Sequence, residues 1–102
     1  MEKGKFIKSQ NSLTYSTGEY ETILTKRNGE YRVEAYSADL EYAGSDPDYC
    51  EIYKNPKFAA LDFAQKCVLQ TRAMDAPDPA QIGKTAYSKA ISLFKENTRI
   101  RD

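Results

Sequence analysis

The pair Asn28-Gly29 constrains the fold of this chain more than any other feature of its sequence. It lies between two runs rich in β-forming residues, 20–26 and 31–36. A type I′ turn needs positive φ at both central residues, and Asn-Gly accepts this conformation readily. The sequence therefore predicts an antiparallel hairpin whose register is fixed by the two-residue turn. The expected cross-strand partners are Arg27 with Glu30, Leu24 with Val33, and Thr22 with Ala35.

Paired residues of such a hairpin share one face of the sheet, and here the two faces differ in polarity. The apolar face holds Tyr20, Leu24, Tyr31, Val33 and Ala35. The polar face has Ile23 as its one aliphatic residue and otherwise holds Glu21, Thr25, Arg27, Glu30, Arg32, Glu34 and Tyr36. We therefore expect a sheet that is covered on one side and wet on the other.

Shorter β-like pieces are expected on both sides of the hairpin. Residues 5–8 and 13–16 precede it, and residues 40–43 follow it as a further strand. Residues 49–54 fit either one more strand or a helical turn begun at Pro47. The sequence thus predicts an antiparallel sheet of three to four strands.

Two helices are expected after the sheet. Asn55-Pro56 is typical of a helix start, and apolar residues recur at helical spacing from about 56 to 73. The predicted inward side holds Phe58, Ala60, Leu61, Phe63, Ala64, Cys67 and Val68, and the polar side holds Lys57, Asp62, Gln65, Lys66 and Gln70. Asp78-Pro79 begins a second helix that ends near Glu96, with Gln81 placed to complete a capping box.

A chain of 102 residues is long enough for one core without metals or disulfides. We expect a single α+β domain over 1–102, with both helices packed on one sheet face and with 1–18 and 98–102 as its more flexible ends. No apolar run is long enough for a membrane helix or a signal peptide, so the expected protein is soluble and cytoplasmic. Cys50 and Cys67 are expected to be free thiols in a reducing cytosol. A disulfide between them would require the fold to bring them together.

The chain contains neither histidine nor tryptophan. Histidine is the commonest general base and metal ligand, so Ser-His-Asp and Cys-His catalysis are excluded. Carboxylate pairs, a lysine nucleophile and a carboxylate metal site stay open in principle, but no nucleophile–base pair converges in the sequence. We therefore predict a protein that is not an enzyme and that needs neither a metal nor another cofactor.

The charges are distributed unevenly along a chain whose formal net charge is zero. Residues 33–53 contain six acidic residues and no basic one, and so carry −6. Residues 1–32 carry +2, and residues 54–102 carry +4. Such a run is either an ordinary solvated face or an acidic surface that attracts a basic partner.

The functional hypothesis is a non-catalytic protein-binding module that occludes a basic, nucleic-acid-handling protein or ribonucleoprotein complex. Tyrosines near the acidic segment favour it, because tyrosine supplies contact area at low entropic cost. The candidate partner-binding residues are Glu34, Tyr36, Asp39, Glu41, Tyr42, Asp46, Asp48 and Glu51. The alternative is a small nucleic-acid-binding regulator that uses Lys84, Lys89, Lys95, Arg99 and Arg101. The pI of about 6.3 disfavours this alternative.

Several features are shared with a known family. They are Tyr20 opening a strand, Gly29-Glu30-Tyr31-Arg32-Val33 after the turn, Leu40 in a third strand, and Phe58-Ala59-Ala60-Leu61-Asp62-Phe63-Ala64 opening a helix. In these features residues 20–69 resemble in outline the HicB-type antitoxins and related small β-β-β-α domains. The resemblance implies the sheet-plus-helix topology and an antitoxin-like regulator. A longer acidic loop replaces the family's glycine-bearing turn before the helix, and no recognisable DNA-binding module follows.

A second comparison is one of analogy alone. Small acidic-faced proteins without a family motif are common among phage-encoded inhibitors of bacterial defence systems, of which anti-CRISPR proteins are an example. An inhibitor of this kind needs no catalytic residues, which agrees with the missing histidine. The expected mode of action is occlusion of a basic surface.

Overall fold

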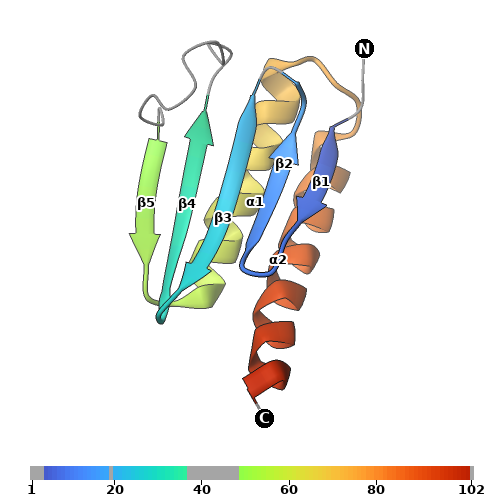
Figure 1. Cartoon of the computed structure of the whole chain (residues 1–102). Helices are drawn as coiled ribbons and strands as arrows, with labels where there is room; N and C mark the ends of the chain where they lie inside the picture. Colours follow the sequence, from blue (N-terminus) through green and yellow to red (C-terminus); the bar gives the residue numbers. More distant parts are fainter. Residues whose placement is uncertain (1–3, 19, 37–48, 102) are drawn as a thin grey trace.

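The structure is a computed structural model that describes residues 4–18, 20–36 and 49–101, with backbone alone for 96–101. Five strands form one antiparallel sheet in sequence order (Figure 1). They are β1 (Lys5–Lys8), β2 (Ser12–Ser16), β3 (Glu21–Arg27), β4 (Glu30–Tyr36) and β5 (Tyr49–Tyr53). Both helices, α1 (Pro56–Ala73) and α2 (Pro79–Arg101), lie on one face, α1 against β3, β4 and β5 and α2 against β2. The predicted α+β fold is confirmed, with five strands in place of three to four.

The central hairpin of β3 and β4 has the predicted register. Asn28 and Gly29 have positive φ values of 52° and 80°, as a type I′ turn requires. The ladder pairs Arg27 with Glu30, Leu24 with Val33, and Thr22 with Ala35. Leu24 and Val33 are fully buried beneath the helices, and the alternate residues of both strands lie on the uncovered face.

The region 1–18, expected as a flexible end, supplies the strands β1 and β2. β1 pairs with β2, and β2 pairs in turn with β3. Leu13 and Tyr15 of β2 are 1% and 0% exposed, so this region contributes two side chains to the core.

The ambiguous residues 49–54 form a strand rather than a helical turn. β5 pairs with β4 from Tyr31–Tyr53 to Ala35–Tyr49, which makes it the edge strand opposite β1. The further strand expected at 40–43 lies outside the described residues.

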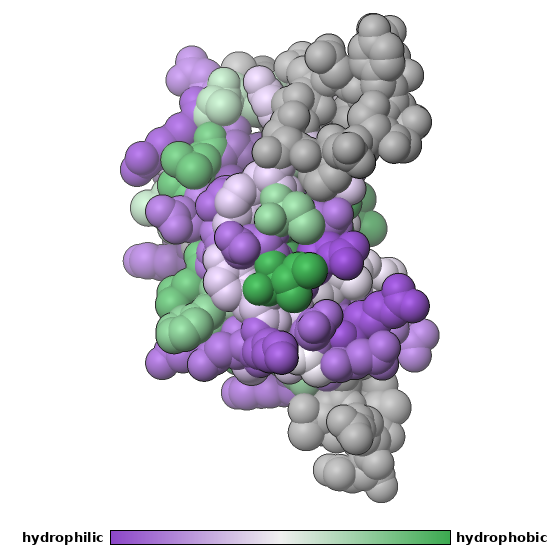
Figure 2. Space-filling model, turned by 90° about the vertical axis from the view of Figure 1, so that its left-hand side faces the viewer, coloured by the Kyte–Doolittle hydropathy of each residue, from purple (hydrophilic) through white to green (hydrophobic). Residues whose placement is uncertain are grey.

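Helix α1 spans the predicted residues, but it is rotated about its own axis relative to the prediction. Phe58 and Leu61, expected to face inward, are 57% and 50% exposed. Asp62 and Gln70, expected to face outward, are buried. The reason is that polar groups on the sheet provide both side chains with hydrogen-bond partners, which makes their burial favourable. Figure 2, a view from the β5 side, shows exposed apolar groups set among polar ones.

The two helix starts differ in their capping. Asn55 accepts a hydrogen bond from the backbone N–H of Lys57 at 2.9 Å, which is the predicted cap of α1. Asp78, which precedes α2, has φ 55°, whereas a capping residue is normally extended. Gln81 contacts the Thr85 hydroxyl oxygen at 3.4 Å, one turn further along α2. The predicted capping box is therefore wrong in its geometry, although the helix begins where expected.

Helix α2 is longer than predicted. It continues to Arg101 rather than ending near Glu96. Residues 97–101 contain neither proline nor glycine, the residues that usually stop a helix. The expected frayed segment from 98 onward is therefore helical as far as residue 101.

The hydrophobic core lies between the sheet and the helix layer. Its largest members are Tyr15, Phe63, Leu13, Leu24, Leu93 and Val33. Cys67 of α1 is fully buried among them, whereas Cys50 is exposed on β5, and both are free, as predicted. Burial raises the pKa of the Cys67 thiol, so it stays protonated and behaves as a small apolar side chain.

A glycine allows the two helices to approach closely. A Cβ atom on Gly83 of α2 would lie 2.7 Å from Cγ2 of Val68 on α1, well inside van der Waals contact. Glycine costs about 1 kcal/mol relative to alanine in a helix interior. The close packing of the helices explains why a glycine occupies this position despite that cost.

This contact predicts a dependence between the two positions. In the wild-type background, the clash should cancel or exceed the roughly 1 kcal/mol of helix propensity that Gly83→Ala gains. In a Val68→Ala background, which removes the opposing methyl group, Gly83→Ala should stabilise the protein by about 1 kcal/mol. Free energies of unfolding from urea titrations of the four proteins give the coupling. Equal effects in both backgrounds would contradict the close contact.

Candidate protein-binding site

The acidic segment joins two neighbouring strands at one end of the sheet. β4 ends at Tyr36 and β5 begins at Tyr49, and the register places Tyr49 opposite Ala35. The last residue of β4 and the first residue of β5 therefore lie at the same end of the sheet, on neighbouring strands (Figure 1). Five candidate partner-binding residues belong to this connection and lie outside the described residues: Asp39, Glu41, Tyr42, Asp46 and Asp48.

The three described candidates lie on two different faces. Glu34 and Tyr36 are on the uncovered face of β4, where the Tyr36 hydroxyl donates a hydrogen bond to Glu34 Oε2 at 3.2 Å. Glu51 pairs with Val33, so it lies on the helix side of β5, where it is exposed because β5 is an edge strand. The structure therefore does not bring Glu34 and Glu51 to one surface, and the prediction of one acidic face is wrong for these two residues. They flank the β5 edge from opposite sides.

Tyr36 is held as a neutral donor. Burial raises the pKa of its hydroxyl, and the neighbouring Glu34 charge and the hydrogen bond to it raise the pKa further. The proton therefore stays on the Tyr36 hydroxyl, which donates the hydrogen bond that Glu34 accepts. The pair keeps a negative charge at the end of β4.

The uncovered face as a whole carries both signs of charge. Arg27 and Arg32 line a shallow depression together with Glu30 and Ile52. Ile7 on β1 and Ile52 on β5 are 54% and 47% exposed at opposite edges. The described carboxylates of this face therefore lie at both of its ends: Glu30 beside the β3–β4 turn, and Glu21 and Glu34 toward the opposite end of the same two strands.

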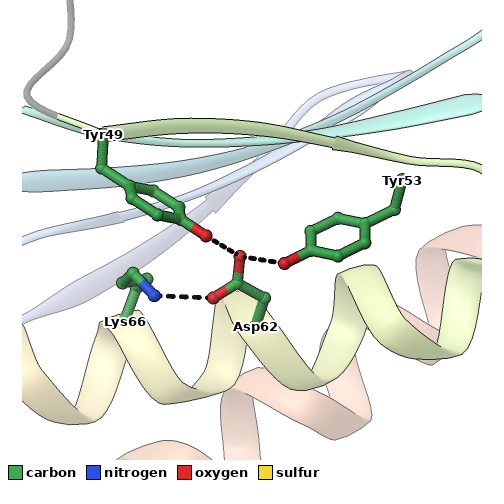
Figure 3. A network of polar contacts seen from close by, with 4 residues as sticks. All are labelled: Tyr49, Tyr53, Asp62 and Lys66. Atoms are coloured by element: carbon green, nitrogen blue, oxygen red, sulfur yellow. Dashed lines mark hydrogen bonds and ion pairs between the residues drawn. The ribbon is translucent and has the colours of Figure 1, made fainter.

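A polar cluster that the sequence did not reveal attaches β5 to α1 (Figure 3). Asp62 Oδ2 accepts hydrogen bonds from the hydroxyls of Tyr49, at 2.5 Å, and Tyr53, at 2.8 Å. Asp62 Oδ1 forms an ion pair with Lys66 Nζ at 2.7 Å. The Lys66 ammonium also lies 4.1 Å from the centroid of the Tyr49 ring. The signal in the sequence was the tyrosine pair at either end of β5, which a strand places on one face.

The protonation states of this Asp62 cluster are fixed by its contacts. Burial alone would raise the pKa of the Asp62 carboxyl, but hydrogen bonds from Lys66, Tyr49 and Tyr53 outweigh burial, and the pKa is lowered. Burial, followed by the bond to Asp62, raises the pKa of both tyrosines. At neutral pH the carboxylate is therefore ionised and both phenols are donors.

These contacts favour a structural role for the Asp62 cluster over a catalytic one. Asp62 is 8% exposed, and both of its oxygens already accept hydrogen bonds. A general base works best with a pKa near the operating pH, whereas the pKa of Asp62 is shifted in the other direction. The cluster holds the edge strand that carries one end of the acidic segment.

A second buried network attaches the other side of α1 to the sheet. Gln70 Oε1 accepts from the Thr22 hydroxyl at 2.6 Å, and Gln70 Nε2 lies within hydrogen-bond distance of Tyr20 O, at 2.9 Å, and of Tyr15 O, at 3.3 Å. Thr71 bonds the Tyr15 hydroxyl at 3.1 Å. Among the described residues, no buried side-chain nitrogen or oxygen atom lacks a hydrogen-bond partner. The polar groups of the interior thus specify one position of α1 over the sheet.

The basic candidates of α2 do not share a face. Lys84 and Lys95 are exposed, and they lie three turns apart on one side of the helix. Lys89 points toward β1, where its ammonium is 5.7 Å from the centroid of the Phe6 ring. Arg99 and Arg101 lie in the part of α2 for which the backbone alone is described.

Comparisons with protein-family models, with curated proteins and with solved structures find no match for this chain. The resemblance to HicB-type antitoxins and the analogy with phage inhibitors therefore stay predictions. Within the described ranges, no three His, Cys, Asp or Glu side chains are grouped as a metal site would require. Neither helix, over the part of it that is described, has the length and apolar character needed to cross a membrane.

The Asp62 cluster predicts a specific acid sensitivity. Asp62→Asn should lower the free energy of unfolding at pH 7 by about 2–4 kcal/mol, because two half-buried phenols and an ammonium lose their charged acceptor. Since the pKa of Asp62 is lowered by folding, its stabilisation is fully present above the ordinary value of 3.8 and is lost as the pH falls through the folded-state value. The stability difference between wild type and Asp62→Asn should therefore narrow below about pH 4.

Urea titrations at a series of pH values measure this difference. Glu30→Gln is the matched control, because Glu30 is an exposed turn carboxylate and its change should stay within about 0.5 kcal/mol at every pH. A difference between wild type and Asp62→Asn that stays constant from neutral to acid pH would show that the Asp62 charge does not stabilise the fold.

Proposed function

We propose that this protein is a non-catalytic protein-binding module that occludes a basic surface on a nucleic-acid-handling protein or ribonucleoprotein complex. It acts as an inhibitor or as an antitoxin-like regulator, and it uses the acidic segment 33–53 for contact. The observation that carries this proposal is the isolation of charge. Six acidic residues and no basic one lie on two adjacent strands and the connection between them, in a chain that is otherwise basic.

The strand order supports the proposal because the acidic run begins and ends on neighbouring strands. β4 and β5 are neighbours, so the two ends of the acidic connection start from one end of the sheet edge. Glu34 and Glu51 add charge on either face of the same edge. A concentrated negative potential attracts a basic partner over a Debye length and accelerates association.

The Asp62 cluster supports the proposal by holding β5 in place. An edge strand has only one neighbour, and here its two terminal tyrosines are also bonded to α1. A binding segment that starts from a fixed anchor loses less conformational freedom on association than one that starts from a frayed strand. Tyr49 and Tyr53 of β5 donate their hydroxyls to Asp62 of α1. We therefore assign partner contact to Tyr36 and Tyr42 instead.

The proposal predicts which charges control partner binding. Reversing four acidic residues of the connection should abolish capture of the partner and slow association, and added salt should weaken the wild-type complex. The four changes are Asp39→Lys, Glu41→Lys, Asp46→Lys and Asp48→Lys. The measurement is affinity capture from a lysate of the source cell, with and without nuclease, followed by kinetics on the purified pair.

A matched pair of double variants separates position from net charge. The first double variant combines Asp46→Lys and Asp48→Lys, and the second combines Glu2→Lys and Glu30→Lys. Both change the net charge of the chain by the same amount, but only the first should weaken partner binding. If binding is indifferent to the connection, the acidic segment is a solvated face and the proposal fails. A partner lost on nuclease treatment, together with sensitivity to changes at Lys84 and Lys95, would favour nucleic-acid binding instead.

A further inference from the structure

The outer face of α1 carries a stripe of three apolar and two polar side chains with symmetric spacing. Its members are Phe58, Leu61, Gln65, Leu69 and Arg72, separated by 3, 4, 4 and 3 residues. At 3.6 residues per turn they fall within an arc of about 80° on the side away from the sheet. Phe58, Leu61 and Leu69 are 57%, 50% and 49% exposed, and they account for three of the five large apolar side chains exposed within the described residues.

This stripe is unusual for a helix that packs on a sheet. Exposed leucines and phenylalanines are ordinary when scattered singly, but here three of them align within 12 residues on one helix face. The rotation of α1 explains the alignment, because burying Asp62 and Gln70 turns these apolar side chains outward. An aligned apolar stripe on a helix is a surface for another helix.

The spacing identifies the partner helix. An order of 3, 4, 4 and 3 residues reads the same in both directions about Gln65, so the stripe is complementary to its own antiparallel copy. In a two-fold dimer both chains use the same patch, so each contact between two different residues occurs twice, once in each direction. We propose that α1 pairs antiparallel with α1 of a second copy of this chain, about a two-fold axis at Gln65.

The contacts of such a pair are complementary at every position of the stripe. Leu61 faces Leu69 of the second copy, and Leu69 faces Leu61. Phe58 faces Arg72, whose guanidinium can stack on the aromatic ring. Gln65 meets Gln65 on the axis, where each amide offers both a donor and an acceptor. A parallel arrangement would instead place Arg72 against Arg72 and lose this complementarity.

The charges at the ends of α1 also agree with an antiparallel pair. Lys54 and Lys57 are exposed at the start of the helix, and Asp75 is exposed just after its end. The mirror position of residue 75 about residue 65 is residue 55, which lies between the two lysines. Each Asp75 therefore lies at the same end of the helix pair as Lys54 and Lys57 of the other chain, and the charges at that end are opposite in sign.

The size of the stripe sets the strength of the dimer. An 18-residue helix is about 27 Å long, and one helix pair of this length buries less than the roughly 800 Å² per partner of a standard interface. We therefore expect a weak dimer, because an interface below the standard size is typical of weak or transient association. It forms at high local concentration.

Sedimentation equilibrium of the full chain, from about 5 μM to about 1 mM, tests the proposal. The weight-average mass should rise from 11.6 kDa toward twice that value. Leu61→Glu and Leu69→Lys should each weaken self-association by at least about 10-fold, since each buries an unpaired charge at two symmetry-related contacts. Ser88→Glu introduces the same charge as Leu61→Glu at an exposed position of α2, and it should leave association unchanged.

Mixing the two stripe variants tests the orientation. In an antiparallel dimer, one contact of the mixed pair joins the new carboxylate at 61 to the new ammonium at 69, and the other keeps its two leucines. An equimolar mixture of Leu61→Glu and Leu69→Lys should therefore recover association. A chain that stays monomeric at about 1 mM, or a dimer that neither variant weakens, would overturn the proposal. Failure of the mixture to associate would also overturn it.

A cross-link gives a second measurement that does not depend on weakening the dimer. Helices pack with axes 8–10 Å apart, which brings Cα atoms on a two-fold axis within disulfide range. In a Cys50→Ser background, Gln65→Cys should form a disulfide-linked dimer on mild oxidation, whereas Gln81→Cys on α2 should not. Equal cross-linking at both positions would indicate random collision and contradict the proposed axis. Circular dichroism of each variant confirms that the fold is retained.

Discussion

The carboxylate of Asp62 is the contact on which the outer part of this structure depends. It is buried and charged, it forms an ion pair with a lysine one turn away, and it accepts hydrogen bonds from two phenols of the edge strand. A buried charge is unfavourable without partners, so α1 and β5 are stable in their observed places only together. Strand β5 is also the C-terminal part of the acidic segment 33–53. The ladder with β4 places β5 at the edge of the sheet, and the Asp62 contacts attach the same strand to the helix beneath it.

The same contact decides which side of α1 meets solvent. Asp62 and Gln70 lie eight residues apart, and both find partners on the sheet, Asp62 on β5 and Gln70 on β3 and at the end of β2. Burying both fixes the rotation of the helix. Phe58, Leu61 and Leu69 then have no place in the core. The exposed apolar side chains of α1 are therefore the counterpart of the two polar side chains that the same helix buries.

Local features were predicted well from the sequence because their causes are local. The turn at Asn28-Gly29 depends on the backbone freedom of two residues, and it fixed the register of β3 and β4. The bounds of α1 depend on Asn55 and Pro56 at its start. The alternation of polarity in the hairpin predicted the covered face correctly. Side chains alternate between the two faces of a strand, so the register decides which residues lie together on the apolar face.

Features that depend on distant partners were not predictable in this way. Nothing near Asp62 in the sequence indicates that Tyr49 and Tyr53 will reach it, so hydrophobicity alone placed Asp62 outside and Leu61 inside. The candidate site shows the same limit. Glu34 and Glu51 belong to one acidic run, yet the pairing of Val33 with Glu51 sends them to opposite faces. Whether neighbouring charges in the sequence share one surface can be predicted only when the strand register is known.

The two proposed surfaces are related through the direction of α1. Ala35 and Tyr36, which precede the acidic connection, lie near Leu69 and Ala73 at the C-terminal end of this helix. Antiparallel pairing of two copies would therefore place their acidic ends at opposite ends of the helix pair, separated by about the 27 Å length of α1. A dimer built in this way presents two negative patches related by a two-fold axis. It would bind most tightly to a partner that offers two basic patches at a similar separation, because the second contact then forms within one complex. A weak dimer would be sufficient for this effect, since the partner itself would hold the two copies together.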